Sequence, residues 1–425
     1  MNEFAYEYKE RHVFKDEEYK EETGAEIISN WLKDKIFLGM TFNEYMKTLY
    51  TPLNIAAGLI VFAGMFLVAM RFLFGLDQIT EASNEQPWGL FLTWGLFAGV
   101  PFSGTGFVIG TGVYIFGLKR YQPIVKNAIL LGFLGYLFAV IFLMIDLGRP
   151  WRIYYPMFVS FGTASVMFLV AWHVTLYLSV QFFEFSPSIL AWLNQAKLRK
   201  VFVNMTLGLT IFGVMLSTLH QAALNAMFLL APGKVHPLWY TSYLPWLAFI
   251  SAIAAAMALM IVVTKLTSVF MKERASPEYL ASVNDITLGL GRAAALVMFT
   301  YLGLRLVSIT HEGSWGYLNT PIGYWFLVEI GLFAILPVLY FYGVMNKNIK
   351  LIQITAAFSM LAIFLNRFNL TLITFNWQLP NRELFFWKEA LVVLSVVIIE
   401  VLVYRWIVNR MPVLRDHPDF VGDGH

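Results

Sequence analysis

Cysteine is absent from this chain of 425 residues. Without thiols the chain can form no disulfide and can ligate no iron–sulfur cluster, so any such cluster must belong to a partner. Charge is also scarce: Asp, Glu, Lys and Arg make up 13% of the residues, against roughly 25% in a soluble domain. This shortage excludes an ordinary soluble protein. The net charge of +3 says little about partners, and no nucleic-acid partner is expected.

What the chain has in abundance is apolar residues, at 58% of the total, with a mean hydropathy of +0.64. Segments of about 20 apolar residues are long enough to span a bilayer as helices. The sequence therefore predicts an all-α integral membrane protein in contact with the lipid bilayer. The ten expected transmembrane helices lie near 51–75, 88–117, 124–146, 159–184, 200–230, 245–271, 284–309, 321–345, 349–374 and 384–408.

Two polar tails flank the expected transmembrane domain of residues 50–408. The longer tail, residues 1–49, mixes both signs of charge and carries apolar residues at helical spacing over 25–46. This spacing predicts a helix that lies in the membrane interface, although a disordered leader with a chance pattern is the alternative. Residues 409–425 form the second tail.

The loops alternate in basic charge. Short cytoplasmic loops carry an excess of Lys and Arg, so the more basic set is assigned to the cytoplasm and both termini with it. The expected location is the bacterial cytoplasmic (inner) membrane. The basic set holds Lys119, Arg120, Lys126, Lys197, Arg199, Lys200, Lys272, Arg274, Lys347, Lys350, Arg410 and Arg415, whereas the opposite set holds Arg149, Arg152, Lys234 and Arg382 beside acidic residues such as Asp77, Glu81 and Glu85.

Polar residues recur at similar depths in the two halves of the chain. Arg305 ends the seventh helix as Asp146 ends the third, and Arg367 lies about as deep in the ninth helix as His220 lies in the fifth. The pattern predicts two four-helix bundles, helices 2–5 (residues 88–230) and helices 6–9 (residues 245–374), with helices 1 and 10 flanking them. In the second unit, Glu329, Arg305, Arg367 and Glu389 could simply pair and lock helices together.

A histidine and a glutamine side by side, His220 and Gln221, lie near the outer end of the fifth helix. Such residues are costly in hydrocarbon and are usually functional, although an intramembrane histidine can simply bond a neighbouring helix. Other polar and aromatic residues are expected at the same depth, so a pocket open to the outer leaflet is predicted. Its expected lining is Trp88, Trp94, Asp146, Arg149, Arg152 and His173.

Several of these stretches resemble the HybB-type membrane subunit of nickel–iron hydrogenases, a member of the wider NrfD/PsrC (polysulfide reductase-like) group. The resemblance covers residues from about 50 to 412. It rests on Arg71-Phe-Leu-Phe-Gly-Leu76, Gln86-Pro-Trp-Gly-Leu90, Asp146-Leu-Gly-Arg-Pro-Trp-Arg-Ile-Tyr154, Ser217-Thr-Leu-His-Gln221, His236-Pro-Leu-Trp239, Phe364-Leu-Asn-Arg-Phe-Asn369 and Glu389.

The resemblance implies a helical bundle without haem or metal. Such a subunit exchanges electrons between the menaquinone pool and a periplasmic ferredoxin-like iron–sulfur subunit, and it is not catalytic alone. The soluble partner would be a nickel–iron hydrogenase, a molybdenum enzyme or a multihaem cytochrome c. The resemblance also implies that the quinone head lies in the first unit near the outer face, where His220 and Asp146 would act on it.

The chain departs from this pattern at Leu169 and Val263, where similar chains usually carry glutamates linked to the quinone site or to proton transfer. An anchor with a degenerate quinone site is therefore one alternative. The others are a b-type cytochrome that uses His173 and His220 as axial ligands, and a secondary transporter. Because no carboxylate is expected in the inner half of the first unit, protons are expected to exchange on the outer side.

Overall fold

The computed structural model describes residues 24–83, 86–379 and 386–417. The expected tail residues 1–23 and 418–425 lie outside this range, as do the loop residues Glu85 and Arg382. The chain divides into two compact units, Met1–Pro52 and Leu53–His425. The first of these is called the N-terminal part below, and the second the main part.

The N-terminal part holds two short helices where one helix was expected over 25–46. Helix α2 (Gly24–Trp31) continues into the π turn η1 (Leu32–Ile36), and α3 (Phe42–Leu49) follows after a break. Leu38 and Gly39 adopt positive φ angles, which a continuous helix does not allow. Thr41 and Glu44 then form a reciprocal capping box that starts α3. The prediction of one helix was therefore wrong.

Ten helices in the described residues are long and apolar enough to cross a bilayer, which confirms the predicted all-α membrane fold. In chain order the ten spans are α4 (Pro52–Phe74), the segmented second helix (Leu90–Ile115), η5 and α8 (Lys119–Ile124 and Val125–Asp146), α10 (Val166–Trp192), α11 with η7 (Ala196–Ala226 and Met227–Leu230), α12 (Leu244–Phe270), α13 (Pro277–His311), α14 (Pro321–Met345), α15 with η10 (Ile349–Phe368 and Asn369–Ile373), and α16 (Trp387–Arg410). Between them lie the short elements η2 (Leu76–Gln78), η6 (Pro150–Arg152), α9 (Tyr155–Phe158), η8 (Lys272–Arg274) and η9 (Ser314–Asn319).

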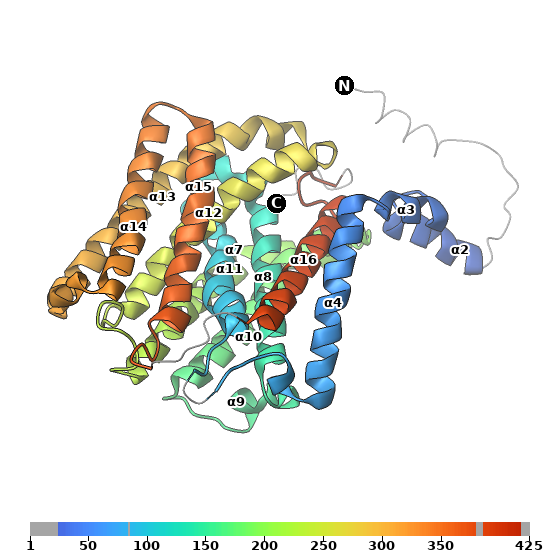
Figure 1. The fold of residues 1–425 in the computed structure, drawn as a ribbon. Coiled ribbons are helices and arrows are strands. Elements are labelled where there is room, and N and C mark those ends of the chain that lie inside the picture. The colour runs from blue at the N-terminus through green and yellow to red at the C-terminus, as the bar shows by residue number, and fades with distance from the viewer. Residues whose placement is uncertain (1–23, 84–85, 380–385, 418–425) are drawn as a thin grey trace, which may run out of the picture. The chain divides into compact units, whose positions relative to one another are not determined.

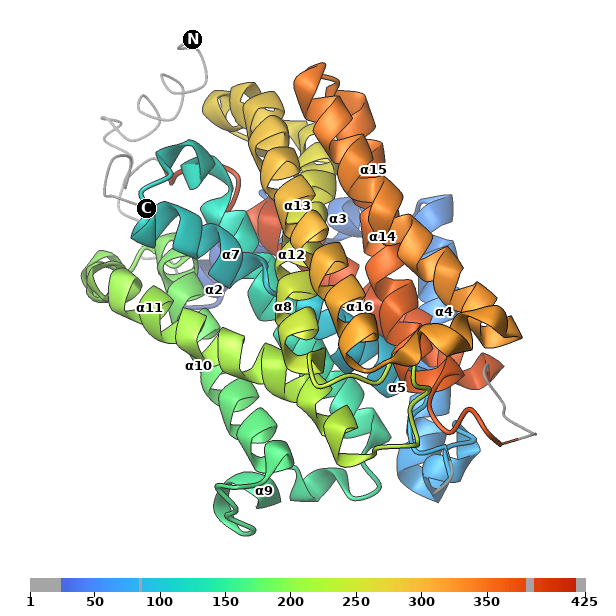
Figure 2. The same cartoon turned by 90° about the vertical axis from the view of Figure 1, so that its left-hand side faces the viewer.

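Helices that follow one another in sequence mostly pack against one another. Helix α10 packs on α8 and α11, while α12, α13, α14 and α15 contact each other in turn, and α15 returns to α12. Figures 1 and 2 show α13, α14 and α15 as neighbours, with α16 beside α4 in Figure 1. The Ser395 hydroxyl of α16 donates to the Ile60 carbonyl of α4 at 2.9 Å. The division into two four-helix units stays a prediction.

The second spanning helix is irregular along its whole length. It consists of α5 (Leu90–Leu92), the π turn η3 (Thr93–Ala98), α6 (Gly99–Phe102), α7 (Thr105–Gly110) and the π turn η4 (Thr111–Ile115). Pro101 lies in α6, just before the break at Ser103 and Gly104, where the Ser103 hydroxyl donates to the Gly99 carbonyl at 2.7 Å. The Thr105 hydroxyl donates to Ala128 of α8 at 2.7 Å. The Ser103 hydroxyl thus bonds a backbone carbonyl of its own helix near the kink, and the Thr105 hydroxyl bonds one of the neighbouring helix.

Glycines let this helix and α8 approach α10 closely. A Cβ atom on Gly106 or on Gly132 would lie within 2.8 Å of the Gln181 amide nitrogen. A Cβ on Gly95 would overlap the Phe142 side chain. Small residues at such positions allow close helix packing in lipid.

The fourth spanning helix begins and ends later than its expected range of 159–184. Helix α10 begins after Ser165, whose hydroxyl accepts from the Phe168 amide at 3.5 Å, and it runs to Trp192 with Pro187 inside it. The capping serine delays the start of the helix. Consequently, residues expected at its inner end lie about two turns within the helix.

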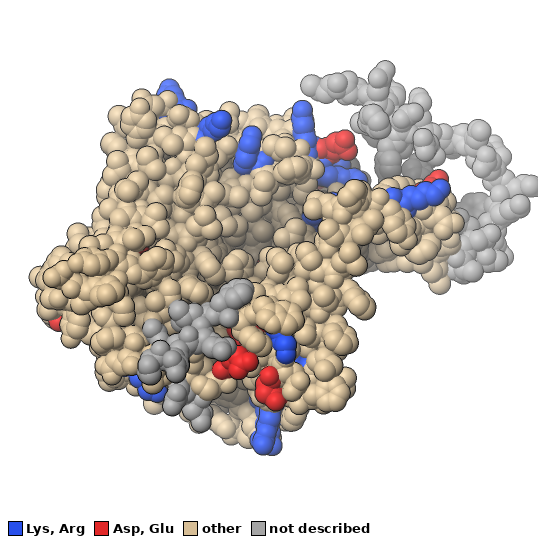
Figure 3. Space-filling view, in the orientation of Figure 1, with Lys and Arg blue, Asp and Glu red and all other residues tan. Residues whose placement is uncertain are grey.

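The loops that follow α11 and α15 are joined by backbone pairing. Val235 and Phe375 form an antiparallel bridge. The His236 amide donates to the Thr374 carbonyl at 3.0 Å, and the Asn376 amide donates to the Lys234 carbonyl at 2.6 Å. These loops share the end of the main part opposite to the α14–α15 connection. Figure 3 shows basic side chains along the edge that carries that connection.

Candidate functional site

His220 is fully buried in α11 and both of its ring nitrogens are hydrogen-bonded. Its Nδ1 lies 2.8 Å from the Leu216 carbonyl one turn earlier. A carbonyl can only accept, so Nδ1 carries the proton and Nε2 accepts from the hydroxyl of Tyr136 in α8. The imidazole is thereby fixed in one tautomer and one orientation.

Gln221 holds the Tyr136 phenol from the other side. Its amide nitrogen donates to the Tyr136 hydroxyl at 3.1 Å and to the Val100 carbonyl of α6 at 2.9 Å. The ring of Tyr177 in α10 packs edge-on against Tyr136, with centroids 4.7 Å apart, and lies 5.4 Å from the His220 ring. We call His220, Gln221, Tyr136 and Tyr177 the His220 cluster. Tyr136 and Tyr177 had not been expected in the site.

His173, one turn before Tyr177 on α10, lies close enough to His220 to interact with it electrostatically. It is half-buried, and its Nδ1 has no hydrogen-bond partner within the described residues; the same is true of the indole nitrogen of Trp172. A buried polar atom without a partner costs free energy unless a ligand or water satisfies it. The His173 nitrogen is therefore available to an oxygen-bearing ligand at the edge of the cluster, whereas the Trp172 ring packs among Phe158, Phe161 and Phe168.

Asp146 is the last residue of α8, and Arg149 and Arg152 follow it before and in η6. Asp146 ends this helix about 15 Å beyond Tyr136, at 1.5 Å per residue. It is half-buried and interacts electrostatically with Arg71 of α4 and Glu389 of α16. Arg149 and Arg152 are exposed, and Arg152 stacks over the Tyr155 ring at 5.0 Å. These three side chains approach the surface and not the interior around His220.

The two tryptophans of the predicted site face other neighbours. Trp88 packs among Phe97, Phe228 and Phe375, with ring centroids 4.5 to 5.5 Å away. Trp94 packs on Phe364 of α15 at 4.9 Å. The structure thus brings His220, Gln221 and His173 together and gives the tryptophans aromatic packing contacts toward the loop after α15 and toward α15 itself.

Glu389 caps the second spanning helix from outside it. Its carboxylate accepts from the Leu90 amide at 2.5 Å and from the Thr80 hydroxyl. A carboxylate at a helix N-terminus satisfies a free amide and complements the helix dipole. Gly89 leaves the space for it, since a Cβ there would lie 2.5 Å from both carboxylate oxygens.

The buried charges of helices α13 to α15 do not pair directly. Glu329 accepts from the indole of Trp239 at 2.9 Å and from the amides of Asn366 and Asn369 at 2.7 and 2.5 Å. Arg305 donates to the Leu238 carbonyl, and Arg367 donates to the Ser251 hydroxyl. None of Glu329, Arg305, Arg367 and Glu389 is in an ion pair within 4.0 Å among the described residues. The suggestion that these acids and arginines form salt bridges is therefore wrong.

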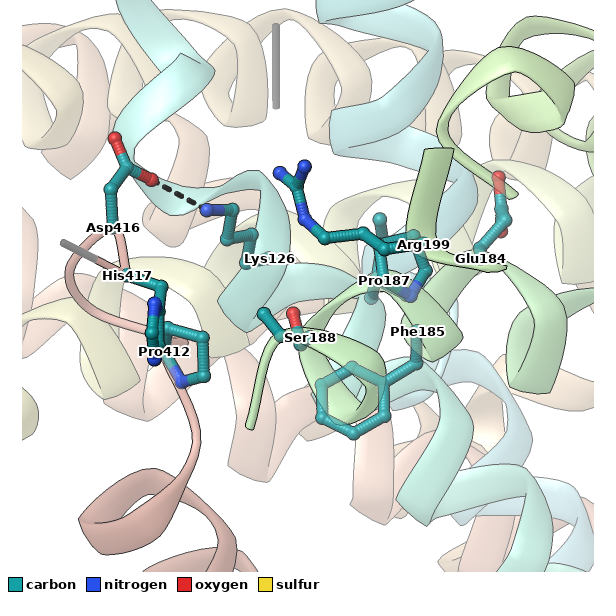
Figure 4. Close-up of a pocket in the computed structure, with 11 residues that line it drawn as sticks. Lys126, Glu184, Phe185, Pro187, Ser188, Arg199, Pro412, Asp416 and His417 are labelled. Atoms are coloured by element: carbon teal, nitrogen blue, oxygen red, sulfur yellow. Dashed lines mark hydrogen bonds and ion pairs between the residues drawn. The ribbon is translucent and has the colours of Figure 1, made fainter. Parts of the chain in front are cut away.

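Glu184 of α10 is a carboxylate that the sequence reasoning missed. It is half-buried and accepts from the Thr210 hydroxyl of α11 at 2.7 Å. It lines a small pocket at the basic end of the main part, with Arg199 and the Lys126–Asp416 pair, whose atoms are 2.6 Å apart (Figure 4). The pocket volume of about 20 Å³ is enough for a single water molecule.

Glu184 also stands near a polar line that leads to His220. Gln181, about one turn earlier on α10, donates to the Tyr177 hydroxyl at 2.8 Å. The Gln181 carbonyl oxygen is buried and has no partner within the described residues. The fourth span was expected to end at residue 184, and Glu184 was not considered in that range. The expectation that the inner half of this region has no carboxylate was therefore wrong.

Comparison with known proteins places this arrangement in a family. A protein from Nitratidesulfovibrio vulgaris is 42% identical over 88% of this chain and 97% of its own length. The probable Ni/Fe-hydrogenase 2 b-type cytochrome subunit of Escherichia coli is 24% identical over 87% of this chain and 93% of its own. The integral membrane subunit of menaquinone reductase from N. vulgaris is 28% identical over 42% of this chain and 43% of its own.

The sequence profile of the family described as "Polysulphide reductase, NrfD" matches residues 78–376. This range contains the second to ninth spanning helices and the whole His220 cluster. Together with the full-length relative at 42% identity, the match shows that the chain belongs to the NrfD polysulphide reductase family.

Proposed function

We propose that the chain is the subunit of a respiratory oxidoreductase complex that binds menaquinone or menaquinol at the His220 cluster. In this proposal it passes electrons between the quinone pool and a periplasmic iron–sulfur subunit. The relatives named as membrane subunits of a hydrogenase and of menaquinone reductase support the quinone and the oxidoreductase partner. A partner must supply any iron–sulfur cluster, because the chain has no cysteine to ligate one.

The observation that carries this proposal is a buried hydrogen-bonded group that consists of an imidazole and an amide from α11 and a phenol from α8. His220, Tyr136 and Gln221 are all 2% exposed or less. Polar groups this deep in a membrane protein are usually functional. The unpartnered nitrogen of His173 fits the needs of a quinone, whose two carbonyl oxygens accept hydrogen bonds.

Menaquinone supplies chemistry that moves two electrons and two protons, so its site must exchange protons. The Tyr136 hydroxyl already donates to His220 Nε2, and a histidine so placed can take up and return a proton. Gln221 keeps the phenol in position. Asp146, which is half-buried at the outer end of α8, would exchange protons with the outside, beside the exposed Arg149 and Arg152.

The experiment replaces His220 with Leu and Tyr136 with Phe in the assembled complex. Leucine is apolar, so His220→Leu should keep the fold in hydrocarbon. Electron transfer from a menaquinol analogue should fall by about 100-fold in His220→Leu, the scale of a lost acid–base group. His311→Leu, at the exposed end of α13, is the matched control and should turn over normally. Normal quinone turnover by assembled His220→Leu would place the site elsewhere.

A b-type cytochrome is the second candidate, because the E. coli relative is named as a b-type cytochrome subunit. Axial ligation by His220 would require Nε2 to give up its bond from Tyr136, since Nδ1 is held by the Leu216 carbonyl. We therefore expect no haem in the isolated chain. A reduced-minus-oxidised spectrum with a b-type α-band would instead favour the cytochrome.

A further inference from the structure

A large apolar pocket opens between helices at a place distinct from the His220 cluster. Its volume is about 850 Å³, within the usual range for ligand sites. Its walls come from α7 and η4, α11, α12 and α13, and are mainly apolar. Phe107 and Phe249, stacked with their ring centroids 6.4 Å apart, line one end, and Arg120, Tyr121 and Arg292 lie at the other.

The two arginines share this end of the pocket with one acid, the exposed Asp285 of α13, which acts electrostatically on Tyr121 as they do. Both arginine side chains are exposed, and neither forms an ion pair within 4.0 Å in the part of the chain that the structure describes. Arg120 lies near the start of η5, at the basic end of the main part. Arg292 lies about 22 Å along α13 from Pro277, at 1.5 Å per residue.

Arg120 and Tyr121 pack closely against α13 at Gly289. Arg120 lies over the ring of the buried Tyr121, with 4.8 Å between its guanidinium carbon and the ring centroid. Gly289 of α13 makes room for both side chains, because a Cβ there would lie 3.1 Å from the Arg120 guanidinium carbon and would overlap the Tyr121 hydroxyl. Arg120 is therefore held against the helix that carries Arg292.

An exposed arginine on a membrane-spanning helix costs free energy unless an anion pairs with it. Guanidinium groups bind phosphate oxygens through paired hydrogen bonds. Basic pockets between transmembrane helices are typical binding sites for the head groups of anionic lipids. A quinone has no anionic head and would leave both arginines unpaired.

We propose that this pocket binds an anionic phospholipid, with its phosphate between Arg120 and Arg292 and an acyl chain along the wall formed by Phe107, Phe249 and Met257. The charge at one end and the apolar lining elsewhere match the two ends of such a lipid. This site is separate from the proposed quinone function and does not rest on it.

The test uses the purified full chain in detergent. Native mass spectrometry and lipid extraction measure the lipid that stays bound, and thermal unfolding is followed with added phosphatidylglycerol, phosphatidylcholine or inorganic phosphate. We expect about one retained anionic phospholipid per chain and a rise in unfolding temperature with phosphatidylglycerol alone. R120Q/R292Q should weaken this binding by about tenfold or more. The control K272Q/K350Q removes two cations at the same end outside the pocket and should bind as the wild type does.

R292Q alone covers the case in which the double variant does not fold, because Arg292 is exposed and its replacement disturbs no buried contact. It should lose most of the retained lipid. An equal rise in unfolding temperature with phosphatidylcholine would overturn the role of the arginines. An equal rise with inorganic phosphate would show a free-phosphate site and overturn the lipid. Menaquinone retained in place of phospholipid, and lost in R292Q, would overturn the proposal as well.

Discussion

Single side chains fix the ends of helices in this protein, and the carboxylate of Glu389 beside Gly89 is one example. The carboxylate of Glu389 reaches the Leu90 amide because residue 89 has no side chain. This explains in physical terms why a glycine follows Trp88 at the start of the second spanning helix.

Replacing Gly89 with Ala should lower the free energy of unfolding by about 1–3 kcal/mol, the usual cost of an overpacked contact. The new methyl would lie 2.5 Å from both Glu389 carboxylate oxygens, so the cap must move. Thermal unfolding in detergent measures the effect. Gly58→Ala in α4 is the control, because a Cβ there meets nothing within 4 Å; an equal loss in both variants would contradict the role of the cap.

At this scale the sequence predicted part of the His220 cluster. His220 and Gln221 were identifiable because polar residues are conspicuous in an apolar helix. Tyr136 and Tyr177 were not, because the sequence alone does not distinguish a hydrogen-bonded tyrosine from any other aromatic residue of a membrane helix. Only the structure shows that Tyr136 bonds His220 and that Tyr177 accepts from Gln181. Asp146 could be placed at a helix end, but its neighbours Arg71 and Glu389 come from distant parts of the chain.

Among the elements, α10 carries a line of polar groups along one face. Glu184, Gln181, Tyr177 and His173 follow each other at spacings of three or four residues, which places them on the same side of a helix. The line begins at the small pocket of Figure 4 and ends beside His220. We propose this line as a proton route from the basic end, where the sequence had suggested none.

We expect Glu184→Gln to slow proton uptake from the basic end by about tenfold or more, while menaquinol binding stays normal. The amide keeps the size of the side chain but cannot carry a proton. A pH-sensitive dye in vesicles that contain the complex records the uptake. Glu312→Gln, at the opposite end of the main part, serves as the control. Unchanged uptake in Glu184→Gln would mean that protons exchange on the outer side alone.

The loop between α11 and α12 contains a histidine that resists protonation. His236 is 1% exposed and is surrounded by the rings of Trp239, Tyr317 and Trp377. Burial lowers the pKa of His236 from 6.5 to about 4. The unfolded chain therefore binds a proton near pH 6.5, whereas the folded loop does so only near pH 4.

The free energy of unfolding should consequently decrease as the pH drops from about 6.5 to about 4, by on the order of 2–3 kcal/mol in total. Below that range the contribution of His236 is already lost. Thermal unfolding of the wild type and of His236→Gln across this range measures the effect. The variant should be less stable at pH 7 and should depend less on pH; parallel curves for the two proteins would contradict the prediction.

On the scale of the whole molecule, the fold followed from length and hydropathy. Ten apolar runs became ten helices because a bilayer leaves the backbone few alternatives to a helix. The predicted helix boundaries were wrong where a local capping interaction sets the end of the helix, as at Ser165 before α10 and between Leu38 and Thr41 before α3. Which helices touch was not predictable, because side chains such as Arg71 and Ser395 bond partners far away in sequence.

The predicted topology places both termini in the cytoplasm, because the loops alternate in basic charge. The absence of native cysteine allows single cysteines to report on each side. Cysteines at Gly148 and Gly316, where a new side chain meets no neighbour, should react with an impermeant thiol reagent added outside intact cells. A cysteine at the exposed Gln195 should not. The reverse labelling pattern would invert the topology.

The backbone bridge between the loops that follow α11 and α15 has a mechanical consequence. A transporter that alternates its access must separate its moving parts at one surface and then at the other. Here Lys234 and His236 are joined to Asn376 and Thr374 by main-chain bonds, beside the buried His236 ring. This surface cannot open there without breaking both bonds. If the proposed redox partner docks on this surface, it would meet the same backbone geometry at every encounter.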